Sequence, residues 1–336
     1  MAQVSKPFMN ESILSLIGNT ALIRLARVFD NLHFNLFAKL EGFNPGGSIK
    51  DRAAFYMISE AWRSGQIHSG TTVIESTSGN LGIGLAQVCA HFGLRFICIV
   101  DAKTTRCNIE VLKALGAEVD VITEPDRTTG EFLQARIDRV QYLCSIIEDS
   151  FWPNQYANVN NARAHYNTMR EILEALDGRV DYLFCPTSTC GTIRGCAEYA
   201  MEHSPKTKIV AIDAVGSVIF GDQPRKRLIP GHGAAVVPKL LRRELVDECI
   251  HVSDWECVVG CRRLVKLESL LVGGSSGGVL MAVERVAPRI KHDSVCVMIF
   301  PDRGDRYLDT IYSDEWVIDH WGALPEFSKK PVVAHA

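Results

Sequence analysis

Residues 71–93 read TTVIESTSGNLGIGLAQVCAHFG, and this stretch decides the fold class. Its first six residues, TTVIES, contain four β-branched side chains in succession, Thr71 to Ile74, which is typical of a buried strand. After a short polar loop, residues 80–93 have the length and the terminal glycine of a helix. Residues 94–101 form an apolar run, so the stretch predicts a strand–loop–helix–strand unit of a parallel sheet.

The same alternation continues along the chain. It predicts helices over 107–117 and 130–143 and a helix starting near Thr192, and it predicts strands over 118–123, 180–187, 208–214 and 294–302. Short buried strands that alternate with longer helices are typical of the α/β class, in which helices cover both faces of parallel sheets. We therefore expect two doubly wound domains with mostly parallel sheets, and a site between them at the carboxyl ends of the strands.

The bulk composition excludes several classes of function. The 336 residues carry a net charge of −3, so no basic field favours nucleic acid or anionic lipid. No apolar run reaches the roughly 18–20 residues of a membrane helix, and the first residues lack the pattern of a signal peptide. The eleven cysteines contain no C-x-x-C pair and no metal-ligand spacing, which predicts free thiols and a cytoplasmic protein without a metal.

Residues 44–52, NPGGSIKDR, place Lys50 at the expected start of a helix. That end of a helix repels cations, so the amine of Lys50 is more easily neutral and nucleophilic, and such an amine can form a Schiff base. The preceding glycines would let the backbone approach a ligand. The structural alternative is that Ser48 caps the helix, Asp51 completes a capping box, and Lys50 points to water.

Three further loops combine hydroxyl side chains with glycines at expected helix starts, namely residues 75–80 (ESTSGN), 187–192 (TSTCGT) and 273–278 (GGSSGG). Free backbone N–H groups at such positions suit an anion. The structural alternatives are capping by Ser78 or Asn80 in the first loop and by a serine in the third. A dinucleotide site with Asp101 as the ribose acid would need G-x-G-x-x-G, whereas the glycines after residue 78 follow G-x-x-G-x-G.

Taken in this order, the four loops resemble the pyridoxal-phosphate-dependent enzymes of the cysteine synthase and cystathionine β-synthase type. IGNTALIRL at 17–25 and PDRGDRYLDT at 301–310 extend the resemblance over residues 11–320. The resemblance implies fold type II, as in the tryptophan synthase β subunit, and a homodimer. It implies an N-terminal domain over 37–155, a C-terminal domain over 15–36 plus 156–322, and a tail over 323–336.

The resemblance also implies a role for each loop. Lys50 would form the Schiff base with pyridoxal 5′-phosphate and act as the base at the substrate Cα. Asn80 would bond the ring hydroxyl of the cofactor, and Ser275 would face its pyridine nitrogen. The phosphate would lie on Ser188, Thr189, Cys190, Gly191 and Thr192, the substrate carboxylate on Thr77, Ser78 and Gln155, and Gly216 and residues 231–233 would line the mouth.

The site departs from the cysteine synthase pattern at Leu81, at Ser188 and in PDRGDRY. FWPNQYAN, PTSTCGTIRG and PDRGDRYLDTIYSDEW resemble the branch that makes 2,3-diaminopropionate for siderophores. That branch joins O-phospho-L-serine to L-glutamate through an α-aminoacrylate, giving N-(2-amino-2-carboxyethyl)-L-glutamate and phosphate. We expect Arg136, Tyr156 and Ser188 to hold the additional carboxylate, because an arginine guanidinium can donate two parallel hydrogen bonds to one carboxylate.

Several alternatives remain open at this point. In one alternative, Arg136 is an ordinary exposed charge on its helix. Arg303 is a further candidate for binding the additional carboxylate, and in the corresponding alternative it pairs only with Asp302 or Asp305. The chain would be a cysteine synthase that uses O-acetylserine or O-phosphoserine with sulfide. More distant alternatives are a nucleotide-binding dehydrogenase and a relative that binds but does not catalyse, which the presence of Lys50, Asn80 and Ser275 together disfavours.

Overall fold

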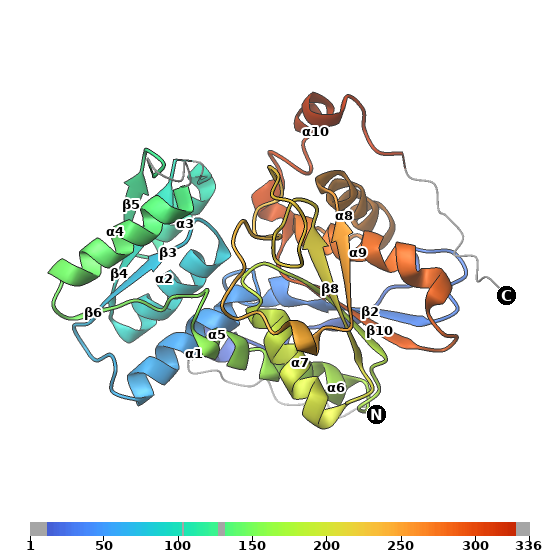
Figure 1. Cartoon of the computed structure of the whole chain (residues 1–336), viewed down its shortest axis with the longest axis horizontal. Helices are drawn as coiled ribbons and strands as arrows, with labels where there is room; N and C mark the ends of the chain where they lie inside the picture. Colours follow the sequence, from blue (N-terminus) through green and yellow to red (C-terminus); the bar gives the residue numbers. More distant parts are fainter. Residues whose placement is uncertain (1–11, 103, 127–131, 327–336) are drawn as a thin grey trace, which may run out of the picture.

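The computed structural model describes residues 12–102, 104–126 and 132–326, which form two lobes, each built on its own sheet (Figure 1). The smaller lobe contains a four-stranded sheet in the order β5–β4–β3–β6, and all its neighbouring strands are parallel. Its strands are β3 (Thr72–Ser76), β4 (Arg95–Asp101), β5 (Glu118–Ile122) and β6 (Ser150–Phe151).

The larger lobe contains a six-stranded sheet in the order β1–β2–β10–β7–β8–β9. Its strands are β1 (Leu22–Arg24), β2 (Asn35–Leu40), β7 (Tyr182–Pro186), β8 (Lys208–Ala214), β9 (Glu248–Val252) and β10 (Val295–Phe300). The β1–β2 pair is antiparallel and the other pairs are parallel. The expected α/β class with mostly parallel sheets is confirmed.

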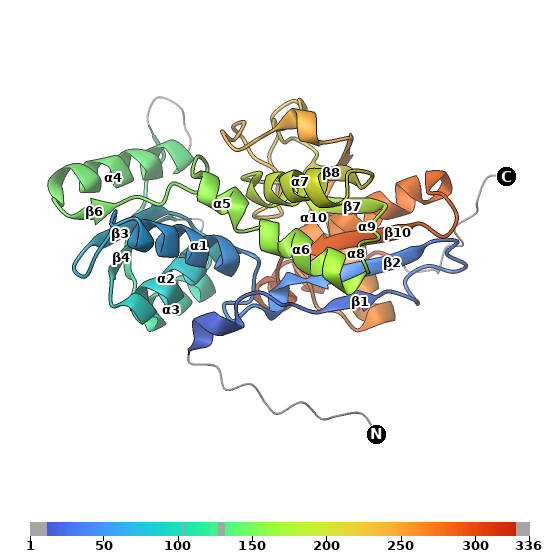
Figure 2. The same ribbon diagram turned by 90° about the horizontal axis from the view of Figure 1, so that it is seen from below.

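Helices cover both faces of the larger sheet (Figures 1 and 2). The smaller lobe contains the helices α1 (Lys50–Arg63), α2 (Asn80–Phe92), α3 (Arg106–Ala114) and α4 (Phe132–Ile146). The others are α5 (Val159–Arg163), α6 (Tyr166–Ala175), α7 (Gly191–His203), α8 (Asp254–Glu268), α9 (Gly274–Val286) and α10 (Asp314–Trp321). Short 3₁₀ turns span Ile13–Leu16, Glu41–Phe43, Arg243–Leu245, Ala287–Arg289 and Gly304–Tyr307. Within the described ranges, no helix is both long and apolar enough to cross a membrane.

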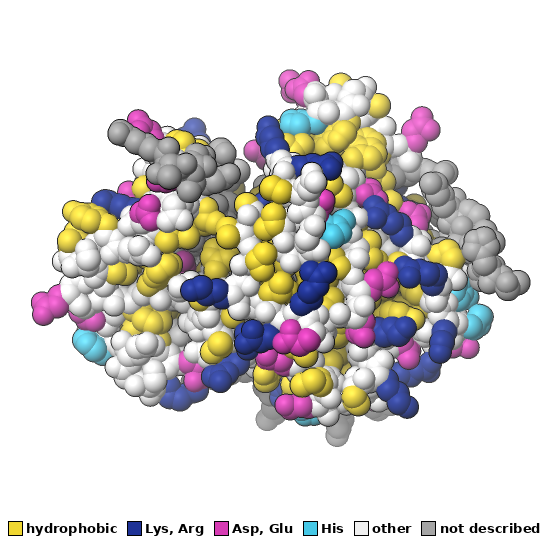
Figure 3. Space-filling model, in the orientation of Figure 1, with side chains coloured by type: hydrophobic (Ala, Val, Ile, Leu, Met, Phe, Trp, Pro, Cys, Tyr) yellow, Lys and Arg dark blue, Asp and Glu magenta, His cyan; other side chains and the backbone are white. Residues whose placement is uncertain are grey.

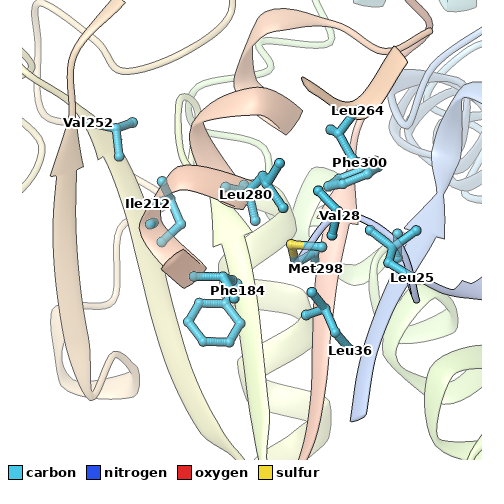
Figure 4. Packing of buried hydrophobic residues seen from close by; sticks show 14 of the residues in the cluster. Leu25, Val28, Leu36, Phe184, Ile212, Val252, Leu264, Leu280, Met298 and Phe300 are labelled. Carbon is cyan, nitrogen blue, oxygen red and sulfur yellow. The ribbon is translucent and has the colours of Figure 1, made fainter. Parts of the chain in front are cut away.

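The core of the larger lobe has two layers because side chains alternate along each strand. On β7, Phe184 faces α9 in one apolar cluster, and its neighbours Leu183 and Cys185 face α7 in another. Figure 4 shows the first cluster, in which Phe184, Met298 and Phe300 from the sheet pack with Leu280 of α9. Burial on both faces explains why these strands are continuous apolar runs in the sequence.

One domain boundary expected from the sequence is wrong. Strand β2 pairs with β10 along its whole length, from Asn35 opposite Val295 to Leu40 opposite Phe300. Residues 37–40 therefore belong to the sheet of the C-terminal lobe, whereas the sequence assigned them to the N-terminal domain. Strand pairing between segments about 260 residues apart leaves no local signal, so the boundary was set too early. The predicted tail over 323–336 lies outside the described residues from 327 onward.

A buried ion network holds the start of α1 against the larger lobe. Arg52 donates to Glu41 at 2.6 Å and to Glu171 of α6 at 2.6 Å, and Lys39 donates to Glu171 at 2.7 Å. All four side chains are at most 8% exposed. Burial alone would raise the pKa of Glu171, but its hydrogen bonds to Arg52 and Lys39 lower that pKa to about 2.

Replacing Glu171 with glutamine is expected to destabilise the fold by about 3 kcal/mol at pH 7, because two buried cations lose their shared anion. The wild-type protein should also lose stability as the pH falls from about 4.5 towards 2, since the unfolded chain takes up the proton of Glu171 first. Glu171→Gln lacks this contribution. Urea unfolding midpoints at several pH values measure both effects.

The matched control is Glu174→Gln on the same helix. Glu174 is 65% exposed, and its pair with Arg170 is 3.9 Å long, so its loss should change stability by less than about 0.5 kcal/mol. Equal midpoints for the two variants would contradict a stabilising role for the buried network.

Candidate active site

Four helices begin at the gap between the lobes, and none of them has a side-chain cap. The N-caps of α1, α2, α7 and α9 are Ile49, Gly79, Cys190 and Gly273. By contrast, α3, α5, α8 and α10 are each capped by a side chain. The capping alternatives for the loops at 75–80 and 273–278 are therefore wrong. Uncapped helix starts leave backbone N–H groups and positive dipole ends available to an anion.

The Lys50 loop does not form the capping box that its sequence allowed. Ser48 Oγ accepts the N–H of Lys50 itself at 3.2 Å, and the Asp51 carboxylate accepts the N–H of Gly46 instead of closing back on the helix. Lys50 is partly buried, and this burial lowers the pKa of its amine, although the nearby Asp302 acts in the opposite direction. The expectation of a readily neutral amine agrees with this environment.

Residues 301–302 join the Lys50 loop to the start of α9. The N–H of Ile49 donates to Pro301 O at 2.8 Å, and the N–H of Gly273 donates to Asp302 O at 3.0 Å. A Cβ on Gly273 would lie 1.9 Å from Asp302 Oδ1, so only glycine fits there. Lys50 and Ser275, which are 225 residues apart in sequence, are thus brought to one site by the chain after β10.

Asn80 lies in the smaller lobe, and residues of the larger lobe orient its side chain. Its Nδ2 donates to Asp302 Oδ2 at 2.8 Å, and its Oδ1 accepts from Arg306. Tyr307 also donates to Asp302 Oδ2. Burial raises the pKa of Asp302, and the hydrogen bonds from Tyr307 and Asn80 act against that rise. Both ends of the Asn80 amide are therefore oriented, and one N–H of Nδ2 remains for a ligand.

The loop at 187–192 forms a tight cradle at the start of α7. Cys190 adopts a left-handed backbone with φ of 63°, which turns the chain into the helix. Thr189 and Thr192 are buried, whereas Ser188 is partly exposed. A Cβ on Gly191 would lie 2.3 Å from Asn161 Oδ1, so the glycine leaves room for the buried Asn161 amide to pack against the start of α7.

A buried histidine orients one hydroxyl of this cradle. His165 Nε2 lies 3.3 Å from Thr192 Oγ1, and its Nδ1 lies 3.2 Å from Thr168 Oγ1. Burial lowers the pKa of His165 well below its ordinary value, so the ring is neutral. A neutral imidazole that donates through Nε2 leaves the Thr192 hydroxyl proton free to point at an anion.

The loop at 75–80 is braced by the segment that carries Gln155. Its N–H donates to Glu75 at 3.2 Å, and its side-chain Nε2 donates to Ser76 O at 3.3 Å. On the other side, Asn108 of α3 donates to Ser78 O at 3.1 Å. The structure therefore brings Thr77, Ser78 and Gln155 together at the start of α2, as expected from the sequence.

Arg136 is not an exposed helix charge, so that alternative is wrong. Its side chain is 11% exposed, and its Nε and Nη1 atoms are buried without a hydrogen-bond partner. Nη1 lies 3.4 Å from an Asp101 carboxylate oxygen, which makes a loose ion pair. Burial raises the pKa of Tyr156, and the charge of Arg136 opposes that rise, which places these two side chains in one electrostatic environment.

The remaining candidates have simpler surroundings. Ser275 is buried in the first turn of α9, next to Ser276, whose hydroxyl has no partner. Arg303 forms an exposed ion pair with Asp305 at 3.3 Å, which confirms the alternative that it pairs with a neighbouring acid. All eleven cysteines are free, and eight of them are buried. Among the described residues, no cluster of His, Cys, Asp and Glu could hold a metal ion.

Sequence analysis missed the partners of these residues. Asp302 was noted only within PDRGDRY and as a possible partner of Arg303, and Arg306 only within PDRGDRY, while His165 and Asn161 were not noted at all. No local signal marked the last two, which lie in the polar stretch NARAHYNT at 161–168. The site residues that these four residues contact are 27 to 226 residues away in the sequence, so the sequence did not reveal these contacts.

The comparisons with known proteins agree with this geometry. Residues 13–302 match the family model described as pyridoxal-phosphate dependent enzyme. An O-acetylserine dependent cystathionine β-synthase from Helicobacter pylori is 32% identical, with a TM-score of 0.85 over 91% of this chain and 100% of that one. O-acetyl serine sulfhydrylase isoform 3 from Entamoeba histolytica is 30% identical, with a TM-score of 0.87 over 99% and 97%. O-ureido-L-serine synthase is 28% identical, with a TM-score of 0.84 over 93% and 99%.

The chain belongs to the family of pyridoxal-phosphate-dependent enzymes, and its fold is that of the cysteine synthase and cystathionine β-synthase group, fold type II. It is a β-replacement enzyme of the cysteine synthase family that depends on pyridoxal phosphate. The residues fit this cofactor, because a partly buried lysine lies near two uncapped helix starts, and one of these carries a tight glycine cradle.

Lys50→Ala is expected to abolish covalent attachment of the cofactor, because Lys50 is the only lysine in the described loops at 44–52, 75–80, 187–192 and 273–278. Borohydride reduction followed by peptide mass spectrometry should place the cofactor on Lys50 in the wild type and leave the variant unmodified. Lys113→Ala is the control, since Lys113 is 57% exposed and pairs with Glu110. Labelling of another lysine in the wild type would contradict this assignment.

Proposed function

We propose that this enzyme joins O-phospho-L-serine to L-glutamate, giving N-(2-amino-2-carboxyethyl)-L-glutamate and phosphate for 2,3-diaminopropionate and siderophore biosynthesis. The observation that carries the proposal is the buried guanidinium of Arg136, whose Nε and Nη1 have no hydrogen-bond partner. A buried arginine without a full set of acceptors is costly unless an anion completes it. An acceptor with an additional carboxylate supplies that anion.

In this proposal, each loop of the site has one task. Pyridoxal phosphate, when bound, supplies an electron sink that makes the Cα proton acidic and lets the β-substituent leave. Lys50 would hold the cofactor and Asn80 its ring hydroxyl, with Ser275 facing the pyridine nitrogen. The phosphate would lie on the cradle of Ser188, Thr189, Cys190, Gly191 and Thr192, and the serine carboxylate on Thr77, Ser78 and Gln155.

Lys50 would also move the proton. Burial lowers the pKa of its amine, so the amine released from the cofactor is able to accept the Cα proton near neutral pH. Phosphate then leaves Cβ with the bonding electron pair, the nitrogen of L-glutamate forms the new bond to Cβ, and that nitrogen loses a proton. The proton held by Lys50 returns to Cα, so protons and charges balance.

The acceptor would occupy the space near Arg136, Tyr156 and Ser188. Arg136 lies on α4 of the smaller lobe, and Ser188 follows β7 of the larger lobe. Burial raises the pKa of Tyr156, so its hydroxyl is a neutral donor at physiological pH. Sulfide has no carboxylate, so Arg136 would keep only its loose ion pair with Asp101.

The alternative is a cysteine synthase that uses O-acetylserine or O-phosphoserine with sulfide. Its support is the similarity to an O-acetyl serine sulfhydrylase over nearly the whole chain. A homodimer and a cytoplasmic location also belong to our proposal. Their support is family membership and the eleven free cysteines.

The test supplies O-phospho-L-serine to the purified holoenzyme and then offers L-glutamate or sulfide in separate reactions. Mass spectrometry of the products decides between the two functions. We expect the adduct of glutamate with a three-carbon amino acid unit, together with free phosphate. Cysteine as the sole product would overturn the glutamate proposal in favour of the cysteine synthase.

Arg136→Met is expected to lower kcat/KM for L-glutamate by about 10- to 100-fold, since one charge-assisted carboxylate contact contributes about 1.5–3 kcal/mol. The half-reaction with O-phospho-L-serine should change little. Arg139→Met, three residues further along α4, is the control because Arg139 is 39% exposed and pairs with Asp120. Equal losses in the two variants would show that Arg136 has no specific part in acceptor binding.

A further inference from the structure

A second arginine, Arg227, adds its charge to the environment of Tyr156. Arg227 lies in the long irregular segment 221–238 of the larger lobe, which runs on the side of that lobe facing the smaller one (Figures 1 and 2). The charges of both Arg136 and Arg227 oppose the burial-induced rise in the pKa of Tyr156. The phenol therefore lies within electrostatic range of a guanidinium from each lobe.

The position of Arg227 is fixed by backbone contacts. Arg227 Nη1 donates to His232 O at 2.9 Å. Gly233, which follows His232, donates its N–H to Thr187 O at 2.8 Å. A Cβ on Gly233 would lie 2.8 Å from Arg227 Nη1, so glycine leaves the room in which the guanidinium lies. Arg227 is thus tied to the first residue of the loop at 187–192.

His232 makes this anchor rigid. It is 1% exposed, its Nε2 lies 3.1 Å from Ile212 O, and its Nδ1 lies 3.6 Å from Cys257 Sγ. Burial lowers the pKa of His232, so the ring is neutral and donates to the carbonyl of β8. The segment that carries Arg227 is therefore held on the carboxyl end of β8 and on α8.

Arg227 has no acidic partner among the residues that the structure describes. The ion pairs found across the described parts of the chain include none for Arg227, and its Nε is buried without a hydrogen-bond acceptor. Basic and acidic side chains are interspersed on the face of the molecule shown in Figure 3. A partly buried, unpaired guanidinium is completed best by an anion from outside the chain.

We propose that Arg227 and Arg136 form a two-arginine clamp, in which each guanidinium holds one carboxylate of a dicarboxylic amino-acid acceptor and the acceptor bridges the two lobes. The inference rests on the proposed function, because it assigns the second carboxylate of that acceptor. It makes Arg227 a specificity-determining residue. Two fixed cations match a dianion and disfavour neutral or monoanionic acceptors, which leave at least one of the two arginines without a carboxylate of the acceptor.

The test compares three amine acceptors on the holoenzyme after O-phospho-L-serine. L-glutamate has both carboxylates, L-glutamine lacks the γ-carboxylate, and 4-aminobutyrate lacks the α-carboxylate. The variants are Arg227→Met, Arg136→Met and the control Lys226→Met, in which the exposed neighbour of Arg227 is changed. The readout is the ratio of kcat/KM between acceptors, which a merely structural change would not move.

We expect the wild type and Lys226→Met to prefer L-glutamate over each analogue by at least tenfold. In Arg227→Met, the preference over one analogue should fall close to one, while the preference over the other persists. Arg136→Met should show the opposite selectivity. An equal loss for all three acceptors in Arg227→Met would overturn the clamp and leave Arg227 with a structural role.

Two further measurements separate the clamp from other outcomes. Calorimetry with glutarate, a dicarboxylate without an amine, should show binding to the wild-type holoenzyme that weakens at least tenfold in Arg227→Met. If no amine acceptor is used but this binding pattern holds, the proposed function fails and the clamp stands. If Arg227→Met slows only the half-reaction with O-phospho-L-serine and not that with O-acetyl-L-serine, Arg227 binds the leaving phosphate and the clamp is overturned.

Discussion

The site depends on one constraint: four helices start at the gap between the lobes and none has a side-chain cap. Their first N–H groups need acceptors, and their dipoles add positive potential. Four helices elsewhere, α3, α5, α8 and α10, have a side-chain cap, and that of α8 is a full capping box, whereas α6 has none. Leaving α1, α2, α7 and α9 uncapped makes the gap a place for anions, which suits a cofactor phosphate and substrate carboxylates. It also disfavours the charged form of a lysine at the start of α1.

The two lobes contribute unlike parts to this gap and are joined across it by side chains. Asn80 of the smaller lobe bonds to Asp302 and Arg306 of the larger lobe. The charges of Arg136 and Arg227, which belong to different lobes, both act on Tyr156. In our proposal, these two charges let the enzyme select its acceptor by charge as well as by shape.

Local signals in the sequence were reliable where one segment determined its own structure. The strands over 71–76 and 208–214 are rich in β-branched and apolar side chains because both of their faces are buried, and the structure places β3 and β8 there. Lys50 and the loop at 187–192 stood out because glycines and hydroxyls precede a helix. Arg136 was ambiguous, since an arginine on a helix reads the same whether its side chain lies inside or outside.

By itself, the sequence determined the α/β class, the order of the loops and the chemical character of each, because hydrophobic period and turn residues act over a few positions. Tertiary structure alone decided that β2 joins the C-terminal sheet, that Arg52 is buried between Glu41 and Glu171, and that Arg227 has no acidic partner within the described ranges. These features depend on contacts between segments far apart in sequence. Such contacts form only when whole sheets and helices pack, and no local pattern encodes them.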